Sequence, residues 1–380
     1  MLISVKGEKK NSSSRVFKMH FYESSIITTK DGLYCQVYGN EHPKGKILVK
    51  PKYIPTDKIH SDALPYRFIG GRKMNRLNLW RDTNSLKKYI MDFAKAYPHY
   101  IFKSDVHEKS PLFFAVPEKY IEREYSPKIG LAELMSMPPG EMDEHLRIVF
   151  DFVSLLLKSG LNLDDLGITY STLMGHYANY KSDINIVVYG KKKFWNLMEF
   201  LKTASSKYLR WKTYEEWEDF YTKRNRHMIH NKETYMKNMY RKKSEGFFRE
   251  TLFVIFAVEN ENETWFRWGE EKYKNRGIAK FNATVRDNIN SVVRPGCYEI
   301  SDSQFIGGDS SCRKLKISKV VFYSRDYCML AYPKEKIEFS GVIEEVTPKS
   351  GERYYRAVVG YFDSYLNESK NDEYIKVIDD

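Results

Sequence analysis

A serine, an aspartate and an asparagine stand close together in the stretch from residue 167 to residue 190. Asp183 and Asn185 open an apolar run over residues 184–189, which predicts a strand. Alternate strand residues point the same way, so both side chains are expected on one face at the start of that strand. Ser171 stands upstream, just before residues 172–175, which could begin a short helix with free backbone N–H groups. Ser171 and Gly175 are therefore candidates to contact a phosphate.

The longer pattern, LGITYS followed by GHY and then SDINIVVYG, resembles the nucleotidyltransferase superfamily of the DNA polymerase beta type. Within that superfamily it is similar to an uncharacterised archaeal family whose members read GVTGS and SDIDLVVYG. The resemblance implies a core in which Ser171 contacts the phosphates of a nucleotide and Asp183 is a metal ligand. It also implies an archaeal origin and, if the chain is active, Mg²⁺ or Mn²⁺ as cofactor. The specific part of the match covers residues 166–190.

Two residues depart from the pattern of that family at chemically important positions. Tyr170 replaces a glycine where a bare backbone would approach phosphate, and a tyrosine resists the positive φ that glycine tolerates. Asn185 replaces the second aspartate, and its neutral amide is a poor ligand for Mg²⁺. A third acid would also be needed, for which Glu259 and Glu261 are merely tolerable by position. We therefore expect an impaired enzyme in which Ser171, Asp183 and Asn185 are remnants.

The net charge of +12 is concentrated in one part of the chain. Residues 190–245 contain fifteen Lys and Arg against seven Asp and Glu, a net charge of +8, which leaves +4 for all other residues. Such a segment favours a polyanionic partner, and its interleaved aromatic residues suit unpaired bases, so we expect nucleic acid, with RNA favoured over DNA. The candidate contacts are Lys191, Lys192, Lys193, Arg224, Arg226, Arg241, Lys242 and Lys243.

The pattern of apolar residues predicts an α+β chain with four parts. Residues 1–14 form a flexible leader, residues 15–140 a mixed α/β domain, residues 141–247 the nucleotidyltransferase-like core with its basic helical segment, and residues 248–380 a β-rich domain. The N-terminal domain should contain a hairpin that turns at Asp31-Gly32. Strands are expected in the β-rich domain at residues 251–258, 278–286, 316–323, 337–346 and 354–362, and an OB-like barrel is one of several architectures that fit them.

Other classes of protein fit the sequence less well. The four cysteines form no C-x-x-C pair, and His227 and His230 stand without a nearby acid or cysteine pair, so a zinc site is not indicated. We expect a cytoplasmic protein, because the chain begins without a signal-peptide pattern and has no apolar run long enough to cross a membrane. Two alternatives stay open. One is an active transferase that adds a nucleotide to RNA, protein or a small molecule, and the other is a scaffold that joins a protein complex through its β-rich domain.

Overall fold

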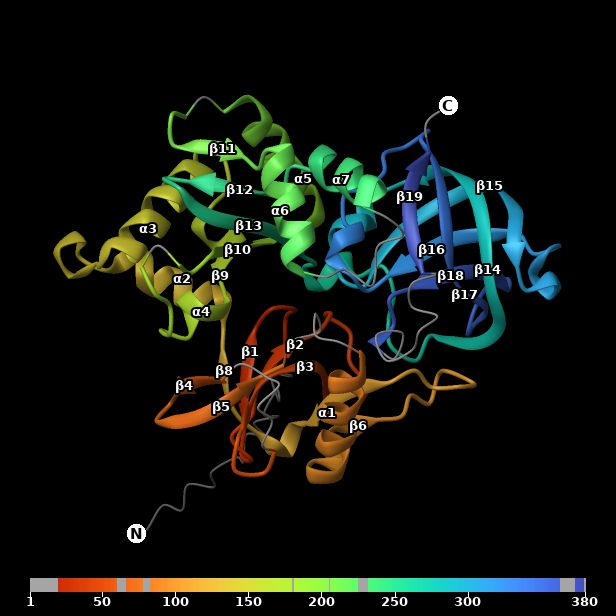
Figure 1. The fold of residues 1–380 in the computed structure, drawn as a ribbon, viewed down its shortest axis with the longest axis horizontal. Coiled ribbons are helices and arrows are strands. Elements are labelled where there is room, and N and C mark those ends of the chain that lie inside the picture. Colours follow the sequence, from red (N-terminus) through yellow and green to blue (C-terminus); the bar gives the residue numbers. More distant parts are fainter. Residues whose placement is uncertain are drawn as a thin grey trace, which may run out of the picture.

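The computed structural model describes residues 20–59, 66–77, 83–179, 181–204, 206–224, 232–362 and 373–378. Helices and three separate sheets alternate along the chain, which confirms the predicted α+β class and the β-rich C-terminal region. Figure 1 shows the N-terminal region, in red and orange, lying below both the core and the C-terminal barrel. The predicted leader lies outside the described residues. No helix in the described part of the chain is both long and apolar enough to cross a membrane.

The N-terminal sheet is built around one long strand, β3 (Lys46–Pro55), which pairs with β2, β5 and β7. The predicted hairpin is confirmed, since β1 and β2 pair with Ile27 opposite Cys35, and Gly32 has φ +82° in the turn. Helix α1 (Thr83–Ala96) packs its apolar side on this sheet. The other strands are β1 (Ile26–Thr29), β2 (Tyr34–Val37), β4 (Tyr66–Ile69), β5 (Arg72–Arg76), β6 (Ile101–Phe102), β7 (Phe113–Pro117) and β8 (Ile121–Tyr125).

The core sheet has the order β11-β12-β13-β10-β9, with β10 (Ile184–Tyr189) parallel to β13 (Thr251–Val258) and antiparallel to β9 (Leu166–Ile168). Both sides of β10 are covered by protein, so its residues are almost all apolar. Gly167 on β9 has no room for a side chain, because a Cβ atom there would lie 2.7 Å from the Cβ atom of Pro127. The remaining strands are β11 (Leu209–Trp211) and β12 (Glu245–Phe248).

Helices cover one face of the core sheet, and the N-terminal region covers the other. Ile184, Ile186 and Val188 pack against α2 (Pro127–Ser136), α3 (Glu144–Leu157) and α5 (Lys191–Thr203). Val187 and Tyr189 belong to the opposite face, where they pack with Tyr22. Helix α2 thus packs with the core, although the division of the sequence at residue 140 assigns it to the N-terminal domain. Helices α6 (Tyr214–Arg224) and α7 (Lys232–Arg241) form a separate pair.

The C-terminal strands close into a barrel. Five strands follow the order β14-β15-β16-β18-β17, and pairing of β14 with β17 completes the circle. Strands β16 and β18 are parallel, while the other neighbours are antiparallel. The sequence analysis missed β15, because its apolar half is followed by polar and glycine residues. Strand β19 pairs with β17 outside the circle. The strands are β14 (Glu271–Asp287), β15 (Gly296–Gly308), β16 (Ile317–Phe322), β17 (Lys336–Pro348), β18 (Tyr354–Val359) and β19 (Tyr374–Ile378).

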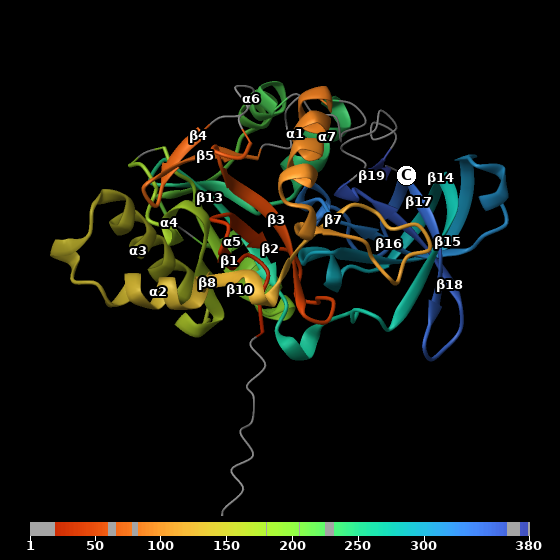
Figure 2. The same ribbon diagram turned by 90° about the horizontal axis from the view of Figure 1, so that it is seen from below.

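The connection between β6 and β7 joins the N-terminal sheet to the barrel, and Figure 2 shows this orange loop reaching toward the barrel strands. His107 forms a bridge with Tyr273 of β14, and its ring lies 2.7 Å from the Ser104 hydroxyl and 3.1 Å from the Tyr361 hydroxyl. Burial, with a smaller contribution from the nearby Arg356, lowers the pKa of His107 to about 3. The neutral imidazole is therefore part of the folded junction.

This junction should make the protein sensitive to acid. The pKa of His107 is lower in the folded protein than in the unfolded chain, so the unfolded state takes up the proton first and stability falls as the pH drops from about 6.5 toward 3. Between pH 6.5 and 4.5 this one group should cost about 2 kcal/mol. Urea unfolding at both pH values should show that His107→Gln loses less stability than the wild type. An equal loss in the two proteins would contradict the assignment.

Candidate nucleic-acid cavity

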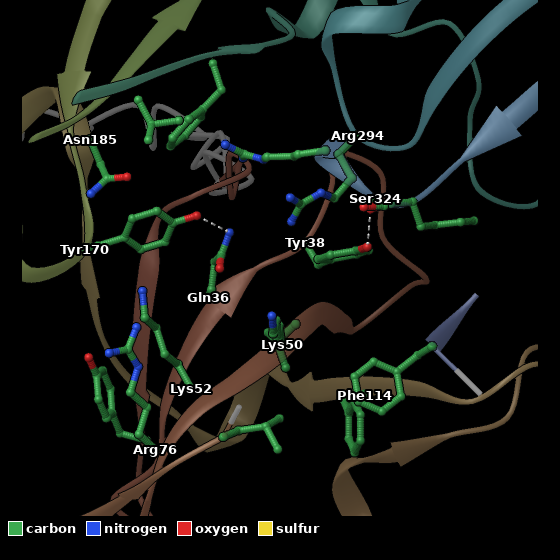
Figure 3. Close-up of a pocket in the computed structure, with 18 of the residues that line it drawn as sticks. Gln36, Tyr38, Lys50, Lys52, Arg76, Phe114, Tyr170, Asn185, Arg294 and Ser324 are labelled. Carbon is green, nitrogen blue, oxygen red and sulfur yellow. Dashed lines mark hydrogen bonds between the residues drawn. The ribbon is translucent and has the colours of Figure 1, made fainter. Parts of the chain in front are cut away.

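A cavity of about 620 Å³ lies where the three sheets meet. Strands β2 and β3 of the N-terminal sheet, the segment from Tyr170 to Asn185 of the core, and Ser324 and Arg325 of the barrel all contribute to its walls. In Figure 3, Lys52 and Gln36 reach up from the N-terminal sheet toward Tyr170, and Lys50 stands on the same sheet farther from it. The motif found in the sequence therefore forms one wall of a site whose other walls come from distant segments.

Positive charge dominates the lining of this cavity. Seven Lys or Arg residues face three Asp or Glu residues there. His176 also lines the cavity, but burial and the nearby cations lower its pKa to about 4, so its imidazole adds no charge at neutral pH. Of those three acids, Glu245 already pairs with Lys212, whose ammonium lies 2.7 Å from it and is itself buried. The seven cations are Lys50, Lys52, Arg67, Arg76, Lys181, Arg294 and Arg325. The cavity thus holds several positive charges for which it supplies few counter-charges.

Lys52 is the centre of this group. Its ammonium lies 3.4 Å from the centre of the Tyr170 ring, and neither Lys52 nor Arg76 forms an ion pair within the described residues. Burial and the nearby cations Arg76, Lys50 and Arg325 hold the pKa of Lys52 well below its usual range, whereas Asp183 opposes them. A buried ammonium among like charges is unfavourable without an anion. The position therefore suits a ligand with several negative charges.

Two arginines of the barrel side share a single acid. The Arg325 guanidinium lies 2.7 Å from a carboxylate oxygen of Glu23, and that of Arg294 lies 3.5 Å from the same oxygen. Glu23 is 1% exposed, so this charge is fixed in place. Arg325 also covers the face of Phe256 at 3.5 Å from the ring centre. Asp326, the residue after Arg325, also lines this side of the cavity, so the two guanidinium groups here face two carboxylates, and the excess of positive charge comes from the other walls.

Tyr170 adopts the backbone conformation that its sequence position disfavours. Its φ is +57°, a region in which a bulky residue is strained by roughly 1–3 kcal/mol. Its hydroxyl accepts a hydrogen bond of 2.9 Å from the Gln36 side chain, and the Lys52 ammonium points at the face of its ring (Figure 3). These contacts hold the ring in the cavity. The tyrosine that stands where the resembled family has glycine is thus part of the cavity wall.

The residues around the start of β10 include few acids. Asp183 and Asn185 both line the cavity, as predicted for one face, and the neighbour of Asn185 across the sheet is Val254. The next residue in the same row is Glu245, which is neutralised by Lys212. An amide, a valine and a paired glutamate are not the ligands that two divalent metals require. No group of three His, Cys, Asp or Glu residues in the described chain could hold a metal.

The two later acids considered from the sequence lie elsewhere. Glu259 follows the last residue of β13, whereas Asp183 precedes the first residue of the parallel strand β10, so the two acids are at opposite ends of the sheet. Burial raises the pKa of Glu259 to about 7, although Lys191 opposes this. Glu261 accepts a hydrogen bond from the Tyr22 hydroxyl. Neither acid can complete a site with Asp183.

Ser171 and Gly175 occupy different surroundings. Ser171 lines the cavity, but it lies inside α4 (Tyr170–Leu173), a single turn. Thr169 stands at the N-cap position, but its hydroxyl donates to the backbone oxygen of Ser24 and does not cap the turn. Gly175 ends this turn with φ +68° and lies outside the lining of the cavity. The structure thus brings Ser171, Asp183 and Asn185 together in the cavity.

The predicted basic segment makes many of its contacts within the protein. Lys191 pairs with Glu259 at 3.1 Å, and Lys193 pairs with Asp165 at 2.6 Å. Lys242 is buried and donates to the backbone oxygens of Arg325 and Asp326, while Arg241 pairs with Glu335. Lys243 lies 4.6 Å from the Tyr240 ring centre, and burial lowers its pKa. Lys192 is exposed; the Arg224 side chain, Arg226, His227 and His230 lie outside the described residues.

The cations of the cavity were missed by the sequence analysis. Apart from Lys181 of the core, they come from the N-terminal sheet and the barrel side. Residues 15–140 carry 21 Lys and Arg against 13 Asp and Glu, the same net charge of +8 as residues 190–245 but spread over more than twice the length. One local signal was present, because Lys50 and Lys52 alternate on a strand and must share a face.

The lysine triplet offers a direct test of which charges are structural. Lys191→Met should destabilise the protein by about 3 kcal/mol at pH 8, because the buried Glu259 would lose its partner. The loss should be smaller at pH 6, where the raised pKa of Glu259 allows its protonation. Lys192→Met is the matched control, and its effect should stay within about 0.5 kcal/mol. Equal stabilities of the two variants in chemical unfolding would refute a structural role for Lys191.

Comparison with known proteins finds a relative that is itself uncharacterized. The chain is 28% identical over 360 residues to an uncharacterized protein of Methanocaldococcus jannaschii, a match that covers 93% of this chain and 97% of the relative. No family model matches the sequence, and no solved structure matches it.

Proposed function

We propose that this chain is a nucleotidyltransferase-like protein of the DNA polymerase beta superfamily that binds nucleic acid in its central cavity without metal-dependent catalysis. The observation that carries the proposal is the group of cations around Lys52, which faces too few carboxylates. RNA is favoured over DNA, because the cavity also presents rings that can stack on unpaired bases. The partly exposed rings on its walls are Tyr38, Tyr170 and Tyr323, while Tyr53, Phe114 and Tyr361 are buried.

The superfamily assignment has support from the arrangement of the core. Strand β10 carries Asp183 and Asn185 at its entrance, and the turn with Ser171 stands beside it in the same cavity. The barrel supports a nucleic-acid function in the same way, because its closed order of five strands, with one parallel pair, suits an OB-like barrel. Barrels of that kind bind single-stranded nucleic acids in many unrelated proteins.

Phosphate groups are the ligands that best suit the charges in the cavity. A phosphodiester accepts hydrogen bonds from lysine and arginine, and charge-assisted bonds of this kind are among the stronger ones in proteins. Lys52 and Arg76 form no ion pair within the described residues, although Asp183 lies near enough to act on the pKa of Lys52, so a bound phosphate would give both cations a direct partner. Phosphate contacts of this type give affinity without sequence preference. The cavity should therefore bind many sequences with similar strength.

The alternative function is an active transferase, and the residues of the same cavity argue against it. The metals of such an enzyme activate the attacking hydroxyl and neutralise the triphosphate. Here Asn185 and Val254 stand where acids would be required, while Lys52 places a positive charge near Asp183. Cations of the protein can thus neutralise phosphate, but nothing in the described cavity replaces the missing acids. Binding without transfer is consistent with both observations.

Replacing Lys52 should separate binding from folding. We expect Lys52→Met to weaken binding of a fluorescein-labelled 12-nucleotide oligo(U) by at least about tenfold in fluorescence anisotropy, since one charge-assisted phosphate contact is lost. The slope of log affinity against log salt should fall by about 0.7. The unfolding temperature of the free protein should not decrease, because removing the charge relieves repulsion with Arg76 and Lys50.

The exposed Lys87 on α1 provides the matched control, and Lys87→Met should bind like the wild type. If Lys52→Met kept full affinity while charge reversal at Arg241, Lys242 and Lys243 removed it, the binding surface would be the basic segment and not the cavity.

A further inference from the structure

Three buried polar atoms of residues that line the central cavity have no hydrogen-bond partner within the described residues. They are Nδ1 of His176, Nε of Arg294 and Oδ2 of Asp326. A buried polar atom without a partner costs free energy, so a ligand that supplies the partner gains affinity. The chemistry of these three atoms therefore indicates which groups the ligand should carry.

Asp326 differs from the other two residues because a carboxylate only accepts hydrogen bonds. Nε of Arg294 is a donor that a phosphate oxygen can satisfy, and Nδ1 of a neutral histidine donates or accepts according to its tautomer. A carboxylate, by contrast, repels phosphate. No hydrogen bond or ion pair of the described residues involves the Asp326 carboxylate. This acid therefore needs a donor on the ligand and gains nothing from the phosphates.

The backbone at Asp326 is held in place on both sides. Asp326 lies in a single 3₁₀ turn, Arg325–Tyr327, where its N–H donates to the Ser324 hydroxyl at 3.2 Å. The Lys242 ammonium donates to the backbone oxygens of Arg325 and Asp326, at 2.9 and 3.3 Å. The torsion about the Cβ–Cγ bond of an aspartate is broad, so either carboxylate oxygen can turn toward a ligand. Asp326 thus offers an acceptor beside Arg325 in the wall of the cavity.

The sugar–phosphate backbone of a nucleic acid offers one kind of hydrogen-bond donor. Its phosphate and ring oxygens accept hydrogen bonds, whereas the ribose 2′-hydroxyl also donates, and deoxyribose lacks this group. The N–H groups of the bases are donors too, but their pattern differs from base to base. A strand that is held through its phosphates therefore brings a 2′-hydroxyl close to the phosphate contacts whatever its sequence.

We propose that Asp326 distinguishes RNA from DNA in the cavity by accepting a hydrogen bond from a ribose 2′-hydroxyl. This assignment rests on the proposed binding of nucleic acid in the cavity and adds the group that selects the sugar. In a complex with DNA the carboxylate would have no donor and would lie near bound phosphate, and both effects weaken binding. Because all ribonucleotides carry the same hydroxyl, this selection is independent of sequence.

A fluorine in place of the 2′-hydroxyl tests the assignment, since it keeps the base and the RNA-like sugar shape but cannot donate. In fluorescence anisotropy, wild-type protein should bind the labelled 12-nucleotide oligo(U) at least about tenfold more tightly than its 2′-fluoro analogue, as expected for a hydrogen bond to a charged group. Asp326→Ala should reduce this ratio to less than about twofold. The variant should bind oligo(U) more weakly than the wild type, and the 2′-fluoro analogue no more weakly.

Asp164→Ala is the matched control. Asp164 is an exposed acid in the middle of another 3₁₀ turn, Leu163–Asp165, and it lies outside the lining of the cavity. This variant should keep the wild-type ratio of the two affinities. Asp326→Ala should also bind inorganic tripolyphosphate at least as tightly as the wild type in calorimetry, because a repulsive charge is removed. Weaker binding of tripolyphosphate would show that Asp326 supports the cavity and would overturn its role as a contact of the sugar.

The remaining outcomes separate this inference from the function on which it rests. If wild-type protein binds the two oligonucleotides equally, or if Asp326→Ala keeps the wild-type ratio, the selection of the sugar by Asp326 is refuted and binding in the cavity stands. If wild-type protein binds neither oligonucleotide nor tripolyphosphate, both proposals fail.

Discussion

Mutual repulsion among enclosed cations is the interaction on which the central cavity depends. Lys52 lies among Arg76, Lys50 and Arg325 in a place where water cannot fully screen their charges. Such an arrangement costs free energy in the unliganded protein. The packing of three sheets around the cavity must therefore hold it together, and a polyanion would remove the repulsion. The charges that would favour binding of a polyanion therefore lower the stability of the unliganded protein.

The fold explains how these charges are held close. Strand β3 pairs with three other strands, and this fixes Lys50 and Lys52 on the face turned to the core. The barrel side contributes Arg294 and Arg325, which are anchored by the buried Glu23 of the N-terminal region. Tyr170 fills the space between them, and its contacts with Gln36 and Lys52 offset the strain of its backbone. Each region alone would present an incomplete surface.

Local features of the sequence were predicted well where they depend on neighbouring residues. The strand at residues 251–258 was predicted with the bounds that the structure has, and Asp183 and Asn185 share one face because alternation in a strand requires it. The hairpin of β4 and β5 was missed, because its exposed residues lack the apolar alternation of a half-covered strand. The surroundings of each charge could not be predicted at all. Nothing near Lys191 in the sequence indicates that Glu259 will become its buried partner.

Calorimetry with inorganic tripolyphosphate can distinguish neutralisation of a bound polyanion by lysine and arginine from neutralisation by a metal. The full chain should be titrated once with EDTA present and once with excess Mg²⁺. If lysine and arginine neutralise the ligand, binding in EDTA should be as tight as with Mg²⁺, or tighter, because Mg²⁺ reduces the charge of the ligand. Binding that requires Mg²⁺ and disappears in EDTA would contradict the account and indicate a working metal site at Asp183.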